Sequence, residues 1–267
     1  MLVSVIIPTY KPGKYIDNCL QSIGLQTIDA KKFEVIIVLN GCDEPWHSQV
    51  ETLIAKYLSE HNVSLIQTEI LGVSNARNIA LDLSKGDYVA FIDDDDYISP
   101  RYLEELLEYS SPQCIALTDS LYFDEDTGKF DYGNIHHREY LKLHENQNPS
   151  LYQVRRFLNG PVMKLIHKDI IGKRRFDKRF SNGEDSLFMA LISDKIQKCH
   201  FCQPDAIYYR RIRLDSATTR KRSLFNRILN SYKAIIQYLK YWIQRPSDYN
   251  IMFMISRIVA QFKNILV

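Results

Sequence analysis

The sequence has few of the features that mark secreted, membrane-spanning or nucleic-acid-binding proteins. Its five cysteines are an odd number without disulfide-framework spacing, and Cys199 and Cys202 have no second C-x-x-C pair to complete a zinc site. No apolar run approaches the length that spans a bilayer. The apolar stretch from Leu2 to Ile7 lacks a basic leader and is broken by Pro8, so we expect no signal peptide and a cytoplasmic protein.

Charge is distributed unevenly along the chain. Residues 207–267 contain 12 lysines and arginines against 2 acidic residues, which leaves the first 206 residues net acidic. A basic stretch can bind nucleic acid, but no nucleic-acid-binding motif accompanies this one, and we expect no nucleic-acid partner.

Short β-branched runs alternate with helix-period segments through the first hundred residues. Val3 to Pro8 and Phe33 to Leu39 are predicted strands, and the second is apolar on both faces, as a central parallel strand is. Further helices are predicted at 45–59, 72–83, 100–109 and 184–196, and further strands at 63–67, 114–122, 162–166 and 206–210. This order predicts an α/β domain whose mainly parallel sheet is flanked by helices.

A polar segment without clear periodicity, residues 124–149, interrupts this pattern and is predicted to be a loop or small excursion beside the site. It contains His136, His137 and His144. No companion spacing supports a metal site, so we expect exposed loop histidines.

Two basic amphipathic segments, Leu224 to Ile243 and Tyr249 to Val267, end the chain. They combine aromatic and basic residues: Tyr238, Trp242, Phe253 and Phe262 with Lys233, Lys240, Arg257 and Lys263. This composition suits helices that lie on an anionic membrane surface, which is the interpretation we favour. The alternative is a helix pair that packs its apolar face on the preceding domain.

Four consecutive aspartates, Asp93 to Asp96, follow the apolar segment from Tyr88 to Ile92. Like charges repel, so the run favours a bound cation. Ligands bind at the carboxyl ends of strands in open α/β sheets, where one or two carboxylates can hold a divalent ion on substrate phosphates. The alternative is an acidic turn that caps the helix starting near Pro100. Taken alone, the run fits both interpretations equally.

Five motifs occur in an order that resembles the bacterial nucleotide-sugar glycosyltransferases of family 2. They are Val3 to Tyr10, Glu34 to Gly41, Gly72 to Asn78, the D-x-D segment Phe91 to Pro100, and the Glu-Asp segment Gly183 to Phe188. The resemblance covers roughly residues 1 to 215. It implies a GT-A-type α/β fold, with residues 1–219 as the glycosyltransferase domain and residues 220–267 as a helical C-terminal extension.

The resemblance also implies a role for each acidic motif. Asp95 would coordinate Mg²⁺ or Mn²⁺ at the donor diphosphate, and Asp93 would contact the ion or the ribose. Asp185 would be the general base that takes the proton from the acceptor hydroxyl, and Glu184 would contact the acceptor. The alternative for this last pair is that both acids complement a helix dipole.

The positions assigned by resemblance to the nucleotide and donor are Pro8, Thr9, Tyr10, Asn40, Arg77, Asp93, Asp94 and Arg213. The guanidinium fork of Arg77 suits phosphate or carboxylate, with a helix-surface ion pair as the alternative. Arg213 would close near the diphosphate, unless it belongs to an ordinary basic loop. Asn40 stands where many members carry a base-reading acid, and its amide offers both a donor and an acceptor. We expect uracil as the base.

The sequence therefore predicts a metal-dependent, inverting glycosyltransferase. It would move a sugar from a nucleoside-diphosphate sugar, UDP-linked, onto a glycan or lipid-linked acceptor in cell-surface polysaccharide synthesis, with peripheral contact to the inner face of the cytoplasmic membrane. A sugar-1-phosphate nucleotidyltransferase is one alternative, but residues 8–13 are not its Gly-rich loop with Arg and Lys. A non-catalytic nucleotide- or glycan-binding scaffold is the other, and it would have no need of Asp185.

Overall fold

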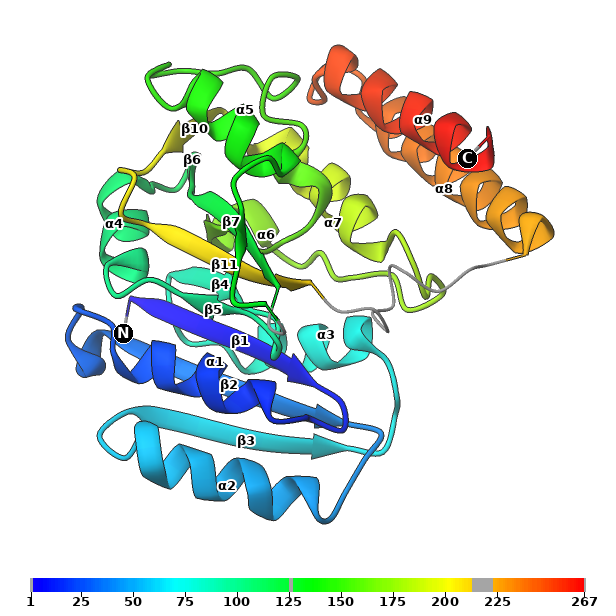
Figure 1. Cartoon of the computed structure of the whole chain (residues 1–267). Coiled ribbons are helices and arrows are strands. Elements are labelled where there is room, and N and C mark those ends of the chain that lie inside the picture. The colour runs from blue at the N-terminus through cyan, green and yellow to red at the C-terminus, as the bar shows by residue number, and fades with distance from the viewer. Residues whose placement is uncertain (1, 125–126, 213–222, 267) are drawn as a thin grey trace.

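Seven strands form the main sheet of the computed structural model, which describes residues 2–124, 127–212 and 223–266 (Figure 1). Their order is β10-β6-β9-β4-β1-β2-β3. Pairing is parallel throughout except that β9 runs antiparallel to β4 and β6. The strands are β1 (Val3–Thr9), β2 (Phe33–Asn40), β3 (Asn62–Thr68), β4 (Tyr88–Phe91), β6 (Cys114–Leu117), β9 (Lys164–His167) and β10 (Lys198–Phe201).

Helices cover both faces of this sheet. The strand order advances from β1 to β3 and then returns to β4, and crossovers between parallel strands are right-handed. Consequently α1 (Tyr15–Gly24) and α2 (Trp46–Tyr57) lie on one face, and α3 (Val73–Leu83) lies on the other. All eight residues of β2 are buried between them, as its unbroken apolar run predicts.

A smaller sheet packs beside the first, with the order β5-β11-β7-β8. Its strands are β5 (Tyr97–Ile98), β7 (Asp119–Asp124), β8 (Phe130–Asp131) and β11 (Ile207–Ile212). The single strand predicted over residues 114–122 is therefore wrong. The chain leaves the main sheet at Thr118, whose N–H donates to Met163 O, and continues in the second sheet as β7.

The segment predicted to be a loop, residues 124–149, contains β8 and a helix, α5 (Ile135–Leu143). The side chain of Asn134 caps this helix by accepting hydrogen bonds from the N–H groups of His136 and His137. His136 is buried, with Nδ1 2.8 Å from the Tyr122 hydroxyl, and the side chain of His137 is 15% exposed and paired with Asp119. The prediction of exposed loop histidines is therefore wrong for both residues, which lie in α5.

The remaining helices of the α/β part are α4 (Tyr102–Tyr109), α6 (Lys168–Ile171) and α7 (Glu184–Ile192). The predicted helix 184–196 ends earlier than expected, because the chain tightens into a 3₁₀ turn at Ser193–Lys195.

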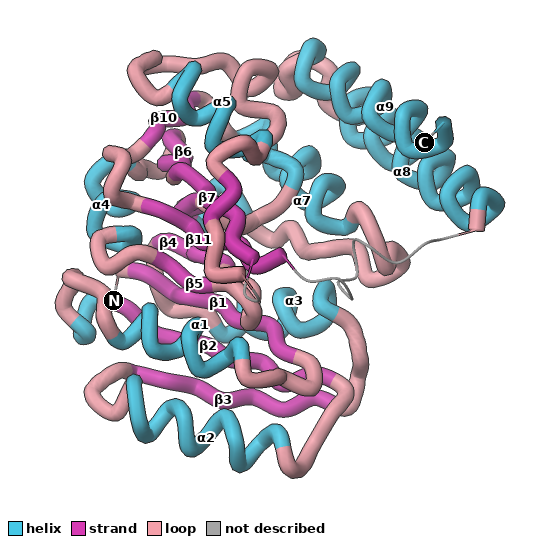
Figure 2. Tube along the Cα trace, in the orientation of Figure 1, coloured by secondary structure: helices cyan, strands magenta, loops and turns pink. Residues whose placement is uncertain are grey.

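The C-terminal segments are two helices, α8 (Leu224–Gln244) and α9 (Ile251–Leu266), which lie side by side at the edge of the molecule (Figure 2). One face of this hairpin packs on the α/β part, where Tyr238 and Phe253 are fully buried. The opposite face exposes large apolar side chains: Leu224, Phe225, Ile228, Tyr232, Ile243, Ile251, Met252, Ile255, Val259 and Phe262. Within the described ranges, no helix has both the length and the apolarity to cross a bilayer.

Candidate functional site

The loops that follow β1 and β2 and the loop that precedes α3 meet at one edge of the main sheet. Asn40 joins all three, because its Nδ2 donates to Thr9 O at 2.7 Å and its Oδ1 accepts from the N–H of Gly72 at 2.9 Å. Pro8 and Thr9 are buried at the end of β1, whereas Tyr10 is 46% exposed. Asn40 therefore positions the loops with both ends of its amide, and Tyr10 faces outward from them.

The aspartate run begins directly after β4, on the strand beside β1. The hydroxyl of Thr9 donates to the Asp94 carboxylate, which ties the run to the end of β1. The backbone N–H of Asp93 donates to the hydroxyl of Tyr208 at 3.1 Å, which ties it to β11 of the second sheet. The run is thus held between the two sheets.

Negative charge accumulates at this point. Asp96 is 3% exposed, and its carboxylate accepts a hydrogen bond from the N–H of Arg211 at 2.8 Å. Arg211 also donates from Nε to Asp95 O at 2.8 Å. Burial raises the pKa of Asp96 well above its usual range, and the charges of Asp95 and Asp93 raise it further.

Arg77 connects the aspartate run to α7. It is 2% exposed, and its Nη2 lies 2.9 Å from Asp93 Oδ1 while its Nη1 lies 2.5 Å from Asp185 Oδ1. Although burial opposes the charge, these two carboxylates raise the pKa of Arg77, so the guanidinium stays protonated. One side chain thereby brings together two acids that are 92 residues apart in the sequence.

The two acids of α7 stand at its first turn. Gly183 adopts the left-handed conformation at the N-cap, with φ +80, which directs the chain into the helix. Burial and then the charge of Asp185 raise the pKa of Glu184 to about 7. Burial also raises the pKa of Asp185, while Arg77 opposes that rise. A raised pKa makes Asp185 a stronger base, which suits proton transfer from an alcohol.

A buried lysine that the sequence analysis did not select supports the turn facing Asp185. Lys164, at the start of β9, is 0% exposed and donates from Nζ to Gly160 O at 2.6 Å and to Val162 O at 2.5 Å. Burial lowers its pKa to about 7. A Cβ on Gly160 would lie 3.7 Å from Asp185 Oδ2, so this turn approaches the acid closely. The available signal in the sequence was a single lysine in the otherwise apolar predicted strand 162–166.

The oxygen-rich run suits a hard divalent ion. Carboxylates are preferred ligands of Mg²⁺ and Mn²⁺. Burial, and then the charges of Asp95 and Asp93, raise the pKa of Asp96, and a cation beside these carboxylates would offset their mutual repulsion. Across the described ranges, no three potential metal-ligating side chains gather around one point. Mg²⁺ in nucleotide sites is commonly held by one or two carboxylates, with substrate phosphates and water completing its shell.

Of the predicted site residues, the structure brings together Thr9, Asn40, Arg77, Asp93, Asp94, Glu184 and Asp185 through the contacts and charges described above. Arg213 lies outside the described residues. Tyr208 and Arg211, which precede it, contact the aspartate run and were not selected from the sequence. Alternation along β11 directs Tyr208 toward Asp93, whereas Arg211, three residues further on, starts from the opposite face and reaches Asp95 at the end of the strand.

Comparison with known proteins identifies the family. The family described as "Glycosyl transferase family 2" matches residues 4–179. "Glycosyltransferase GlyA" from Streptococcus pneumoniae is 30% identical over 208 residues, which are 73% of this chain and 29% of that protein. "Poly(ribitol-phosphate) beta-N-acetylglucosaminyltransferase TarS" from Staphylococcus aureus is 36% identical over 107 residues, 39% of this chain and 18% of that protein. The chain thus spans less than a third of either relative.

Solved structures share the fold. The crystal structure of S. aureus TarS 1-349 in complex with UDP-GlcNAc has a TM-score of 0.75 at 21% identity, over 99% of this chain and 72% of that chain. The mannosyltransferase PcManGT from Pyrobaculum calidifontis, in complex with GDP-Man and Mn²⁺, has a TM-score of 0.61 at 16% identity. The match covers 99% of this chain and 72% of that chain. The predicted GT-A fold, with its mainly parallel sheet, is confirmed. Together with the match over residues 4–179, these findings establish that the chain belongs to glycosyl transferase family 2.

Proposed function

We propose that the chain transfers a sugar from a UDP-linked donor to a hydroxyl of a glycan or lipid-linked acceptor, with inversion at the anomeric carbon, in the synthesis of a cell-surface polysaccharide. The observation that carries this proposal is the double contact of Arg77 with Asp93 and Asp185. It joins the proposed donor side of the site to the proposed base. One relative supports this proposal, since TarS is named as a poly(ribitol-phosphate) N-acetylglucosaminyltransferase and was solved with UDP-GlcNAc.

In the proposed reaction the acceptor oxygen attacks the anomeric carbon, and its proton passes to the Asp185 carboxylate. The bond between the anomeric carbon and the diphosphate breaks, and its electron pair leaves with the nucleoside diphosphate. A single displacement assisted by one base inverts the anomeric centre. General-base assistance of this kind contributes on the order of 10²- to 10⁴-fold to the rate. Glu184, beside the base, would contact the acceptor.

Asp93 and Asp95 would hold a divalent ion at the diphosphate, with Mn²⁺ or Mg²⁺ as the candidates. When bound, such an ion supplies Lewis-acid stabilisation of the departing diphosphate. Mn²⁺ is present in the PcManGT complex with its GDP-sugar, which supports the choice. Pro8, Thr9, Tyr10, Asn40, Arg77, Asp94 and Arg213 are the proposed surroundings of the nucleotide and its phosphates.

Two variants separate base catalysis from donor binding. Asp185→Asn should abolish transfer yet keep the rise in melting temperature that UDP with Mn²⁺ gives the wild type, since ligands stabilise the state they bind. Asp95→Asn should lose both transfer and the rise in melting temperature. Asp169→Asn is the matched control, because Asp169 is exposed on α6, and it should keep transfer and the rise in melting temperature. Wild-type turnover in Asp185→Asn would refute the assigned base, and a full Mn²⁺-dependent shift in Asp95→Asn would refute the assigned ligand.

We also propose that the exposed face of the α8–α9 hairpin rests on an anionic membrane surface. The face carries Phe225, 73% exposed, and Ile243, 67% exposed, on a segment rich in lysine and arginine. Contiguous apolar surface of this kind marks interaction sites, and a basic amphipathic helix suits acidic lipids. Arg257 takes no part, because it is 4% exposed and its Nη2 donates to Arg155 O at 3.1 Å. The membrane would bring a lipid-linked acceptor to the site.

A further inference from the structure

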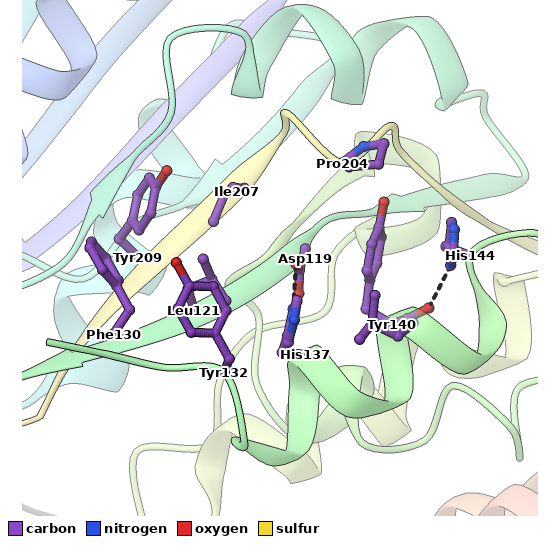
Figure 3. Close-up of a pocket in the computed structure, with 11 residues that line it drawn as sticks. Asp119, Leu121, Phe130, Tyr132, His137, Tyr140, His144, Pro204, Ile207 and Tyr209 are labelled. Carbon is purple, nitrogen blue, oxygen red and sulfur yellow. Dashed lines mark hydrogen bonds and ion pairs between the residues drawn. The ribbon is translucent and has the colours of Figure 1, made fainter.

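A cleft of about 360 Å³ lies between α5 and the smaller sheet. Its lining comes from β7, β8, α5, β11 and the turns beside them: Asp119, Leu121, Phe130, Tyr132, His137, Tyr140, Leu141, His144, Pro204, Ile207 and Tyr209. Figure 3 shows the acid and histidine in the middle of the row, with Tyr132 and Tyr209 on one side and Tyr140 and His144 on the other. The volume falls within the usual range of small-molecule pockets, roughly 300–1,000 Å³.

The cleft and Asp93 lie on opposite faces of β11, and the strand meets the aspartate run beyond the cleft, where Arg211 donates to Asp95 O. Successive residues of a strand point to opposite faces of the sheet. The Tyr208 side chain of β11 points to the face that holds Asp93, and its hydroxyl accepts a hydrogen bond from the backbone N–H of Asp93. Its neighbours Ile207 and Tyr209 line the cleft on the other face. A ligand in the cleft is therefore separated from Asp93 by the strand itself.

Aromatic rings give the cleft its apolar surface. Tyr132 is 62% exposed and Phe130 is 39% exposed, although both lie beside other rings. The Phe130 ring is 5.7 Å from that of Tyr209, and the Tyr132 ring is 5.7 Å from that of His137. Rings held in place by their neighbours and open to solvent on one side offer flat surfaces against which the C–H face of a sugar ring can pack.

The polar part of the cleft is a pair formed by a buried acid, Asp119, and a partly exposed histidine, His137. Asp119 is 4% exposed, with Oδ2 2.8 Å from His137 Nδ1 and Oδ1 accepting from the Ser120 N–H at 2.7 Å. A carboxylate offers about four acceptor positions, so it can still accept from hydroxyl groups. Among the described residues that line the cleft, none is a lysine or an arginine, and the buried Asp119 carboxylate disfavours an anionic ligand. The described lining therefore favours an uncharged ligand rich in hydroxyl groups.

We propose that this cleft binds an uncharged sugar residue of a glycan, as an accessory site separate from the centre of sugar transfer. Tyr132 and Phe130 pack on the sugar ring, and Asp119 and His137 form hydrogen bonds with its hydroxyl groups. The site can hold a second segment of a glycan chain while transfer takes place on the other face of the sheet. Binding here needs neither a donor nor turnover, so it can be tested independently of the proposed reaction.

The test is saturation-transfer NMR on the full chain. The neutral probes are methyl glucoside, N-acetylglucosamine and short oligomers of each, and glucuronic acid is the anionic probe. We expect transfer to the ring C–H protons of the neutral probes and little to glucuronic acid. Tyr132→Ala should weaken neutral-probe binding about tenfold, a loss of about 1.4 kcal/mol. Tyr232→Ala is the matched control, because Tyr232 is 61% exposed on α8, and it should leave binding of the neutral probes unchanged.

A second variant addresses the polar pair. Asp119→Asn keeps the shape of the side chain and should also weaken binding, with an unchanged melting temperature showing that the fold persists. The proposal is overturned if no neutral probe receives saturation, if Tyr132→Ala binds as the wild type does, or if glucuronic acid binds as well as the neutral probes. Binding that persists in Tyr132→Ala but disappears in Asp185→Asn would place the sugar in the transfer site, and would equally overturn it.

Discussion

Arg77 holds Asp185 through a contact of 2.5 Å between Nη1 and Oδ1, while its second terminal nitrogen engages Asp93. The arginine is buried, whereas each carboxylate keeps about a third of its side-chain surface exposed. Both acids are thus fixed by a group that solvent does not reach and remain open to a ligand. The contact also restrains the pKa of Asp185, which burial raises.

Arg77→Lys should lower kcat about 10- to 100-fold, because an ammonium group has no planar fork with which to hold two carboxylates. Since Arg77 lowers the pKa of Asp185, weakening the contact should move the acid limb of the pH–rate profile to higher pH. Initial rates between pH 5 and pH 9 measure both effects.

Arg175→Lys is the control, because Arg175 donates from Nε and Nη2 to Asp82 in an exposed pair outside the site. It should leave both quantities unchanged. An unaltered pH profile in Arg77→Lys would contradict the electrostatic role.

Glu184 should make stability depend on pH. Its pKa in the folded protein, about 7, lies above the ordinary value of 4.5, so its contribution to stability is complete below pH 4.5 and is lost as pH rises through 7. The loss is on the order of 3 kcal/mol, because one pKa unit corresponds to about 1.4 kcal/mol. Urea unfolding at pH 5 and pH 8 measures it.

Glu184→Gln should flatten this dependence, whereas Glu108→Gln, at an exposed position on α4, should leave it intact. If Glu184→Gln and the wild type lose equal stability between pH 5 and pH 8, the pKa of Glu184 is not raised in the folded protein.

The hairpin should influence catalysis through α7. The hydroxyls of Ser186, next to the proposed base, and Tyr238 of α8 lie 2.9 Å apart in a hydrogen bond. Tyr238→Phe removes it, and should cost about 1 kcal/mol of stability and lower the melting temperature by about 2 °C. We also expect kcat to fall while the KM for the donor stays constant.

Tyr249→Phe is the matched control. The Tyr249 hydroxyl donates to Leu191 O at 3.0 Å, near the other end of α7. This variant should lose similar stability and keep its kcat. Equal kcat values for the two variants would mean that Tyr238 only supports the fold.

Membrane contact should depend on the exposed face of the hairpin. The wild-type chain should float with vesicles containing phosphatidylglycerol, and less so at high salt, which screens the charges. The double variant Phe225→Ser with Ile243→Ser should remain with the soluble fraction. Leu25→Ser, a change at a 61% exposed leucine elsewhere, should float as the wild type does. Equal flotation of all three proteins would exclude this face as the contact.

Sequence patterns predicted the central strands well and failed where tertiary contacts decide the structure. Val3 to Pro8 was predicted as a strand and β1 ends one residue later, because burial on both faces leaves an unambiguous apolar run. The helix α5 was missed because its few apolar positions give no clear period. The transfer between sheets at Thr118 was missed, although the polar residues Thr118, Asp119 and Ser120 interrupt the apolar run and were the available signal.

The same division holds for the site. Asp93, Arg77 and Asp185 were selected from motifs, and the structure joins them, although their chemical roles remain predictions. Tyr208 and Lys164 were not selected, because their contacts with Asp93 and with the turn at Gly160 are visible only once the strands are in place. Motifs therefore indicated which side chains carry the chemistry, and packing determined which ones support them.

Two tyrosines of the C-terminal segment hold α7 near both of its ends, Tyr238 at Ser186 and Tyr249 at Leu191. A helix restrained at two points rotates only if its restraints move with it. A change in the orientation of the hairpin therefore either breaks these two hydrogen bonds or moves α7, which carries Glu184 and Asp185.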